Sequence, residues 1–397
     1  MKKFLLLATM ALTLCAQARD SRLAERLDSL LAADYHHDGP GAALIVAIDG
    51  DVAYENYRGI ADMRTCAPID SLTRFNIASL SKQFTVVGAL RLQEQGLLDI
   101  DRSVSLYVPR LTAGIWRDIT PRRLMSHSSG IPDIRQRSDR DFTLYATDTQ
   151  SMAFMYALDS LHFAPGTAYE YINPTFQLVA AIIERQSGEP FEQYQRRHIF
   201  GPAGMTHAQY FRGGIYMPHE AHGYIVNDGS DTGENDNGAT KQRGIADGDF
   251  VDSHGTHWAE CDYGEETFFA TRADGGLYAT ARDMLRWEQA LHHGTVVSAE
   301  TLRQAYTPQV TVSGSRWSTY QNRPHTAYGM GWFIDTAPVP GRGTKIYHTG
   351  DNGGFQAYIA KFDLKGHRVN VIMLENCNNN DRWQTQTLIE QIIAAEL

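Results

Sequence analysis

The strongest constraint on the fold of this chain is that its two ends carry the same kind of pattern. Near the start, apolar runs at Ala42–Ile48 and Val52–Tyr57 flank an Asp-Gly-Asp segment, which is typical of a hairpin turn. Near the end, Gln356–Phe362 and Arg368–Leu374 flank a second turn segment at residues 363–367. Two hairpins predict antiparallel pairing, because parallel strands need long crossover connections.

Helical patterns lie outside both hairpins and fill much of the middle. Residues 20–33 carry leucines at helical spacing, and residues 380–395 carry apolar side chains on one face. Between the hairpins, Phe84–Gln95 is apolar at helical spacing and is followed by Gly96, which favours a helix end. A similar helix is predicted at Gln177–Gln186.

Together these patterns predict an α+β fold. We expect an antiparallel sheet flanked by N- and C-terminal helices, with a mainly helical domain inserted. In this division residues 19–83 and 291–397 form the α/β domain, and residues 84–290 form the helical domain. A chain of 397 residues is long enough for this plan, and 43% hydrophobic residues is a normal globular composition.

The first residues predict an export signal. Two lysines precede an apolar run at Phe4–Leu14, and Ala16-Gln17-Ala18 is a small-x-small cleavage site, so residues 1–18 are interpreted as a signal peptide. Cys15 offers the alternative of a lipoprotein anchor, although Leu14 before it is larger than such a site prefers. We expect a periplasmic or secreted protein with no transmembrane segment after cleavage.

Charge and cysteine content exclude two classes of function. Removing residues 1–18 removes two lysines and no acid, so the formal net charge moves from -10 to -12. An acidic chain is a poor partner for nucleic acid, whose phosphates need a basic face. Cys66, Cys261 and Cys377 remain without C-x-x-C spacing, which excludes a disulfide framework and a cysteine zinc site but leaves one disulfide open.

Residues 227–264 are rich in Asp, Gly and Asn. Their acidic residues do not follow the alternating ligand spacing of a calcium-binding EF-hand loop, so we expect a solvated surface loop. His254, His257 and Cys261 lie in the same stretch. The histidines are three apart and Gly255 disfavours a helix, so the pattern of a metalloprotease is absent and no metal site is expected.

The strongest chemical motif is the tetrapeptide from Ser79 to Lys82. A serine hydroxyl becomes a good nucleophile when a neighbouring base takes its proton, and residues three apart share one face of a helix. Ser79 is therefore the candidate nucleophile and Lys82 its candidate proton acceptor. An N-cap serine followed by an exposed lysine would produce the same four letters, so the motif needs support from elsewhere.

Two further segments supply that support. Tyr171-Ile172-Asn173 lies just before a predicted helix, where a loop can present a phenol and an amide to a cleft. His348-Thr349-Gly350 follows the strand-like run Lys345–Tyr347 and precedes Asp351 and two glycines, where glycine allows a close backbone approach to a ligand.

These motifs, in this order, resemble the serine beta-lactamase and penicillin-binding protein superfamily, in its branch of class C beta-lactamases, D,D-carboxypeptidases and esterases. The resemblance extends over nearly the whole mature chain, from about residue 20 to residue 397. Three supporting segments also match the family: Leu124–Asp133, Gly201–Met205 and Asp274–Asp283.

The resemblance implies a fold that agrees with the α+β reading, and it implies a role for each motif. Ser79 would attack the substrate carbonyl, while Lys82 and Tyr171 would share the proton transfers. Asn173 would orient the substrate amide and hold Lys82.

The third motif would complete the site. His348, Thr349 and Gly350 would bind substrate, and the backbone N–H groups of Ser79 and Asp351 would form the oxyanion hole. The resemblance implies no metal and no organic cofactor.

His348 departs from the lysine that beta-lactamases usually have in the third motif. A histidine is only partly charged near neutral pH, and H-x-G resembles D,D-peptidases, D-amino-acid amidases and esterases more closely. We therefore expect an exported serine hydrolase that acts on small amide, D-amino-acid peptide or ester substrates. A class C-like beta-lactamase and a non-catalytic module that binds cell-wall peptides or penicillin are the alternatives. His127 is expected to have a structural role in its loop.

Overall fold

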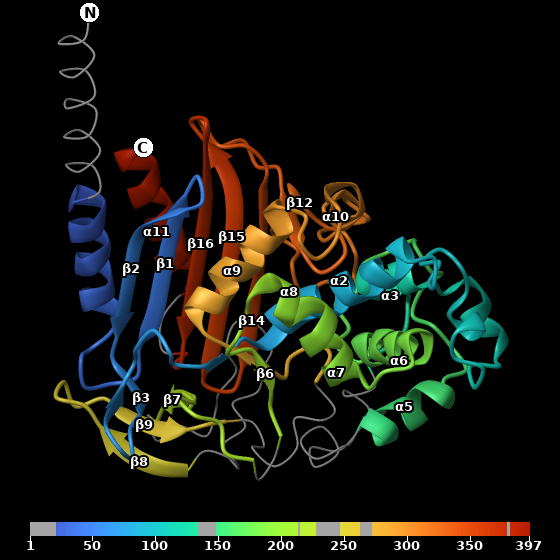
Figure 1. Ribbon diagram of the computed structural model, residues 1–397, viewed down its shortest axis with the longest axis horizontal. Coiled ribbons are helices and arrows are strands. Elements are labelled where there is room, and N and C mark those ends of the chain that lie inside the picture. The colour runs from blue at the N-terminus through green and yellow to red at the C-terminus, as the bar shows by residue number, and fades with distance from the viewer. Residues whose placement is uncertain (1–20, 134–147, 213–214, 228–246, 263–271, 379–381) are drawn as a thin grey trace, which may run out of the picture.

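The structure is a computed structural model, and it has an α+β fold built around one large antiparallel sheet (Figure 1). It describes residues 21–133, 148–212, 215–227, 247–262, 272–378 and 382–397. The sheet contains, in spatial order, β11 (Val310–Thr311), β12 (Thr326–Tyr328), β13 (Phe333–Asp335), β14 (Lys345–Asn352), β15 (Phe355–Leu364), β16 (His367–Glu375), β1 (Ala42–Ile48) and β2 (Asp51–Arg58).

The strands from the two ends of the chain pair within this one sheet, as the hairpin patterns predict. β1 pairs with β16 along its whole length, from Ala42 opposite Glu375 to Ile48 opposite Val369. The first hairpin turns at residues 49–50, which both have positive φ. The second turn is tighter than the five-residue segment expected from the sequence. β15 and β16 continue to Leu364 and His367, so only residues 365–366 form the turn.

The terminal helices cover one face of the sheet. The first helix spans residues 21–34 and lies beside α11 (Arg382–Glu396), where Arg26 and Glu396 form an ion pair of 2.9 Å. Leu27 and Ile393 from the two helices are fully buried in the same apolar cluster as the β1 residue Leu44. This confirms the prediction that both terminal helices flank the sheet.

The opposite face of the sheet packs against α9 (Ala281–His292) and the helical region (Figure 1). Every residue of β1 is buried, since alternate side chains such as Ile45 and Leu44 enter the clusters on the two faces. The other helices are η1 (Ala78–Leu80), α2 (Ser81–Glu94), η2 (Val104–Leu106), η3 (Gly114–Asp118), α3 (Pro121–Met125), α5 (Asp148–Tyr156), α6 (Thr175–Ser187), α7 (Phe191–Gln195), the π-helix η5 (Arg196–Phe200), α8 (Gly201–Ala203) and α10 (Ala299–Ala305).

Residues 227–264 are more regular than the loop predicted from their composition. Asp247–Val251 (β8) and His257–Glu260 (β9) form a three-stranded sheet with β7 (Tyr224–Val226). Trp258 of β9 packs in the apolar cluster of the main sheet, and that burial explains why part of this polar stretch becomes strands. Asp228, Asp231, Glu234 and Asp236 lie outside the described residues. The short strands β3 (Ile60–Asp62), β4 (Ala67–Pro68), β5 (Phe75–Asn76), β6 (Gln209–Tyr210) and β10 (Leu277–Ala279) form two further small sheets.

Three remaining predictions concern the ends and the thiols. The expected signal peptide and Cys15 lie outside the described residues. In the described part of the chain, no helix combines the length and apolarity needed to cross a bilayer. Cys66, Cys261 and Cys377 form no disulfide with one another, so the pairing that the sequence left open among them is not made.

Candidate active site

Ser79 lies in η1, the single tight turn that leads into α2. The residue before it, Ala78, has a φ of 47°, which costs energy for a residue with a side chain. The Asn76 side-chain oxygen accepts a hydrogen bond from the Ala78 N–H at 2.7 Å and stabilises this conformation. Ser79 itself is half-buried, whereas its neighbours Ala78 and Leu80 are buried.

Lys82 is fully buried one helical turn after Ser79. Its Nζ donates a hydrogen bond to Ser79 Oγ at 3.0 Å and another to the Asp274 carbonyl oxygen at 2.9 Å. The same nitrogen lies 4.9 Å from the centre of the Tyr171 ring and 5.4 Å from that of Phe176. The structure therefore brings Ser79, Lys82 and Tyr171 together, and Lys82 is not the exposed lysine of the alternative interpretation.

Asp274 is a member of this group that sequence reasoning did not single out. Its carboxylate lies 3.9 Å from Lys82 Nζ, and both side chains are almost completely buried. Gln177 of α6 donates a hydrogen bond to the other carboxylate oxygen at 3.4 Å. The sequence placed Asp274 only at the start of a matching segment, and nothing in its spacing connects it with Lys82.

Tyr171 is positioned by His127, which lies in the loop after α3. The imidazole packs against the Tyr171 ring at 4.1 Å, and its Nδ1 accepts a hydrogen bond from the N–H of Ile172 at 3.1 Å. Burial lowers the pKa of His127 well below its usual value, and the positive charge of Lys82 lowers it further. A buried neutral imidazole that holds the backbone agrees with the structural role expected for His127.

Asn173 follows on the same loop, just before α6 begins at Thr175. Its side-chain oxygen is buried and has no hydrogen-bond partner among the residues that the structure describes. A buried acceptor without a partner costs free energy, which a donor on a bound molecule would recover. The predicted contact of this oxygen with the Lys82 ammonium is therefore not formed in this structure.

The sequence predicted that His348 follows a short strand at Lys345–Tyr347. In the structure that strand is longer, and His348 lies within β14. Its Nδ1 donates to the Thr349 carbonyl oxygen at 2.6 Å, so its Nε2 accepts from the Tyr328 hydroxyl at 2.9 Å. Burial lowers the pKa of His348 to about 3, with a further contribution from Lys82. His348 is therefore neutral near pH 7, which corrects the expectation of a partly charged histidine.

The third motif contacts the nucleophile segment through its glycine. A β-carbon at Gly350 would stand 2.5 Å from the Ile77 carbonyl oxygen and 3.2 Å from the Ser79 nitrogen, so only glycine allows this approach. Arg382 of α11 donates to the Gly350 carbonyl oxygen at 3.1 Å and pairs with the Asp351 carboxylate at 2.5 Å. The backbones that carry Ser79 and Asp351 are thereby fixed side by side.

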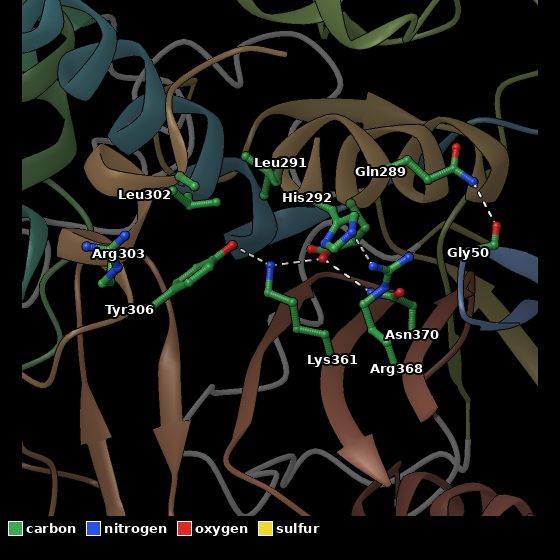
Figure 2. A pocket seen from close by; sticks show the side chains of 12 residues that line it. Gly50, Gln289, Leu291, His292, Leu302, Arg303, Tyr306, Lys361, Arg368 and Asn370 are labelled. Carbon is green, nitrogen blue, oxygen red and sulfur yellow. Dashed lines mark hydrogen bonds and ion pairs between the residues drawn. The ribbon is translucent and has the colours of Figure 1, made fainter. Parts of the chain in front are cut away.

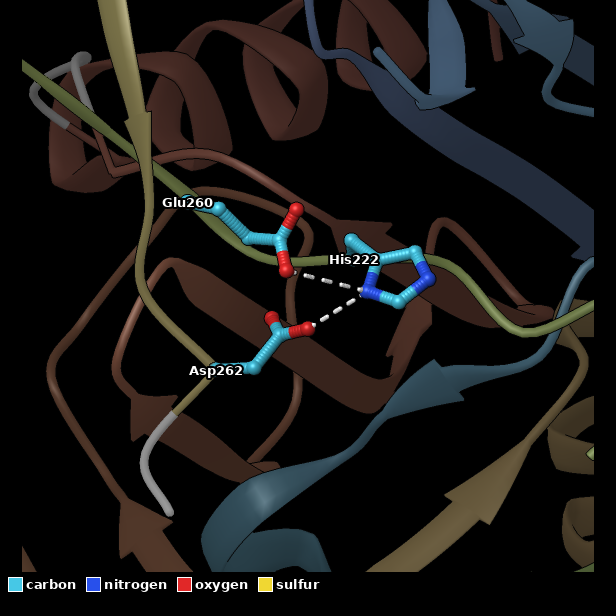
Figure 3. A group of neighbouring side chains, drawn as sticks. All are labelled: His222, Glu260 and Asp262. Carbon is cyan, nitrogen blue, oxygen red and sulfur yellow. Dashed lines mark hydrogen bonds and ion pairs between the residues drawn. The ribbon is translucent and has the colours of Figure 1, made fainter. Parts of the chain in front are cut away.

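A group of His222, Glu260 and Asp262 could hold a metal ion, since its ligand atoms lie within 4.8 Å of one another (Figure 3). His222 Nδ1 already lies 2.7 Å from an Asp262 oxygen, and Arg64 pairs with Glu260. Burial raises the pKa of Asp262 to about 7. These contacts occupy both carboxylates, and they join β9 and the residues just after it to Arg64 between β3 and β4 and to His222 before β7.

The histidines predicted not to bind metal, His254 and His257, are not members of this group. His254 stacks on His36 with ring centres 3.5 Å apart, and His257 bonds to Asp249 at 2.8 Å.

A cavity of about 320 Å³ lies between α9, α10 and the strands β15 and β16 (Figure 2). Lys361 projects into it and forms an ion pair of 2.9 Å with Glu288 and a hydrogen bond with the Tyr306 hydroxyl. None of the candidate active-site residues lines this cavity. It therefore offers a partly buried lysine–carboxylate pair that is separate from the active site.

Comparison with known proteins gives consistent matches. The sequence pattern of the family described as Beta-lactamase matches residues 21–387. A penicillin-binding protein of Bacillus subtilis (strain 168) is 25% identical over 357 residues, which are 87% of this chain and 70% of that protein. A D-aminopeptidase of Cereibacter sphaeroides is 27% identical over 344 residues, which are 85% of this chain and 57% of that protein.

Among solved structures, a D-amino acid amidase from Ochrobactrum anthropi in complex with D-phenylalanine has the same fold. Its TM-score is 0.71 at 19% sequence identity, and the match covers 96% of this chain and all of that one.

Proposed function

The chain belongs to the beta-lactamase family, and on this basis we propose that it is an exported serine hydrolase that forms an acyl-enzyme through Ser79. The proposal rests on one observation above the others. Lys82 Nζ lies 3.0 Å from Ser79 Oγ in a buried setting beside the Tyr171 ring, which is the arrangement that an activated serine requires. The export proposal rests on the signal pattern of residues 1–18.

In the proposed reaction, Ser79 Oγ attacks the substrate carbonyl carbon. Lys82 and Tyr171 share the proton transfers by which the hydroxyl proton leaves Ser79 and a proton reaches the leaving nitrogen or oxygen. The backbone N–H groups of Ser79 and Asp351 stabilise the negative oxygen of the tetrahedral intermediate. Water then attacks the ester and releases the acid product, so Ser79 recovers its proton.

Substrate binding is assigned to the side chains around this centre. The buried Asn173 oxygen is suited to accept a hydrogen bond from a substrate amide N–H. His348, Thr349 and Gly350 would form the wall on the other side. Because His348 is neutral, this wall supplies no fixed positive charge for the carboxylate of a beta-lactam antibiotic.

These features support small amides, D-amino-acid peptides or esters as substrates, and the D-aminopeptidase and D-amino acid amidase among the relatives support the same class. A class C-like beta-lactamase is the second candidate, favoured by the complete set of Ser79, Lys82 and Tyr171. A non-catalytic binding module is disfavoured, since a binder needs no set of groups for proton transfer.

A substrate panel tests the proposal. Purified protein and Ser79→Ala are incubated with D-phenylalanine amide, a peptide that ends in D-alanyl-D-alanine, p-nitrophenyl acetate and nitrocefin. We expect Ser79-dependent hydrolysis of at least one of the first three and little hydrolysis of nitrocefin. Rapid turnover of nitrocefin alone would favour the beta-lactamase, and no Ser79-dependent turnover of any compound would favour the binding module.

A further inference from the structure

We propose that Asp274 is a positioning residue of the active site, whose buried carboxylate keeps the Lys82 ammonium charged and directed at Ser79. This inference rests on the proposed function, because it gives Asp274 a role only if Ser79 is the nucleophile.

Two oxygen atoms of Asp274 flank the lysine nitrogen. The backbone carbonyl oxygen accepts a hydrogen bond from Lys82 Nζ at 2.9 Å, and the carboxylate oxygen Oδ2 lies 3.9 Å from the same atom. The exposed fraction of the side chain is 0% for Lys82 and 4% for Asp274. A charge pair so far removed from water is screened very little.

The position of this carboxylate is itself fixed by α6. Gln177 Nε2 donates to Asp274 Oδ1 at 3.4 Å, and Gln177 is buried between α6 and the segment that precedes β10. Gln177 therefore holds Oδ1, and Oδ2 is the carboxylate oxygen that lies 3.9 Å from Lys82 Nζ. The segment from 274 to 276 continues to Leu277, whose N–H donates to Ser81 Oγ at 3.2 Å, so it is anchored to α2 as well.

Burial alone would favour the neutral form of Lys82, because desolvation destabilises an isolated ammonium. Within the part of the chain that the structure describes, the titratable groups near this nitrogen include, besides Asp274, Tyr171 from the loop before α6, His127 from the loop after α3, and His348 from β14. Both histidines are neutral near pH 7, so they add no competing positive charge. Asp274 is thus the carboxylate that compensates the charge of Lys82 among these neighbours.

A charged Lys82 has a consequence for the first proton transfer. An ammonium can donate a hydrogen bond to Ser79 Oγ but cannot accept the serine proton. The proton that leaves Ser79 on attack would then pass to the Tyr171 oxygen, which must be a phenolate to receive it. The nearby ammonium stabilises that phenolate, so Asp274 acts on the reaction through Lys82.

The variant Asp274→Asn tests the inference, since it removes the charge and keeps the size, the backbone carbonyl and an oxygen for Gln177. The measurement is kcat/KM for p-nitrophenyl acetate from pH 5 to pH 10, with acylation of Ser79 followed by intact-mass spectrometry. At high pH the rate falls as Lys82 loses its proton. In Asp274→Asn we expect this fall to occur at a pH lower by about one unit or more. We also expect kcat/KM at pH 8 to fall about tenfold or more.

The matched control is Glu288→Gln, which removes the carboxylate from the partly buried Lys361 pair outside the active site. Its pH profile should superimpose on that of the wild type. Asp274→Glu restores the charge, so its high-pH limb should return to the wild-type position even where the rate is lower. If Asp274→Asn does not fold, this second variant decides.

The inference would be overturned if the alkaline fall in kcat/KM occurred at the same pH in Asp274→Asn as in the wild type. It would also be overturned if this fall were displaced by a full pH unit in Asp274→Glu. If the proposed function itself were wrong, the result would differ: the wild type and Ser79→Ala would show the same rate at every pH.

Discussion

Gly350 of β14 and Ser79 of η1 lie in direct backbone contact, since a β-carbon at position 350 would come within 3.2 Å of the Ser79 nitrogen. The contact joins the sheet, built from the two ends of the chain, to the turn that carries the nucleophile. Arg382 donates to the Gly350 carbonyl oxygen from the far end of the sequence. The candidate active site is therefore assembled from three distant segments and depends on their close approach.

Gly350→Ala should damage both stability and activity. The added methyl would stand 2.5 Å from the Ile77 carbonyl oxygen and 2.9 Å from the Ala78 β-carbon, so the backbones must separate. We expect a loss of about 1–3 kcal/mol in the free energy of unfolding, typical of overpacking, together with a fall in acylation rate. Gly114→Ala is the control, because a β-carbon there meets no atom within 4 Å. Urea unfolding of both variants checks the prediction, and equal stability would contradict it.

Lys82→Met should abolish most of the activity, because it removes the amine and keeps an unbranched side chain that is one atom shorter. We expect kcat/KM for a p-nitrophenyl ester to fall by about 10²–10⁴-fold, the usual contribution of a proton-transfer group. Lys361→Met removes the lysine of the partly buried pair with Glu288 and should lower stability while leaving the acylation rate unchanged. If both variants lost activity to the same extent, the effect would come from stability and not from the chemistry of Lys82.

His348 should make the protein less stable in acid. Its pKa is about 3 in the folded protein and about 6.5 when unfolded, so between these values the unfolded state binds more protons. The contribution of His348 to stability is therefore complete above about pH 6.5 and is lost as the pH falls. His348→Gln has no imidazole to titrate, so it does not lose stability in this way. We therefore expect the difference in free energy of unfolding between wild type and variant to change by about 1.4 kcal/mol per pH unit near pH 5.

Urea unfolding of His348→Gln at pH 4, 5, 6 and 7 measures this change. His37→Gln serves as the control, because the His37 side chain is 78% exposed. Parallel pH dependence for His348→Gln and the wild type would show that His348 is not the buried neutral group described above.

The sequence predicted the sheet and the terminal helices well, because their signals are local. The hairpin at Asp49 and Gly50 is specified by its own turn residues, and the alternation of apolar side chains in β1 follows from burial on both faces. The turn at Lys365 and Gly366 is shorter than the predicted segment 363–367. The polar residues on either side of it favour a turn, but they are also compatible with strand ends.

The spatial relationships in the site were harder to predict. Ser79 and Lys82 lie one turn apart where η1 leads into α2, so their spacing was sufficient to place them together. Asp274 is 192 residues from Lys82, and only tertiary packing brings the two into contact. The charge state of His348 also depends on burial under Tyr328 and on the field of Lys82, neither of which is encoded near position 348.

The most direct test of the central claim is intact-mass spectrometry of the mature protein incubated with benzylpenicillin, beside Ser79→Ala. The account predicts that any drug-sized adduct on the wild type is absent from Ser79→Ala, and that p-nitrophenyl acetate in a parallel reaction gives an acetyl adduct with the same dependence. A lasting drug adduct would group the protein with penicillin-recognising peptidases, whereas an acetyl adduct alone would indicate an esterase or amidase. Equal labelling of the wild type and Ser79→Ala would contradict the assignment of Ser79 as the nucleophile.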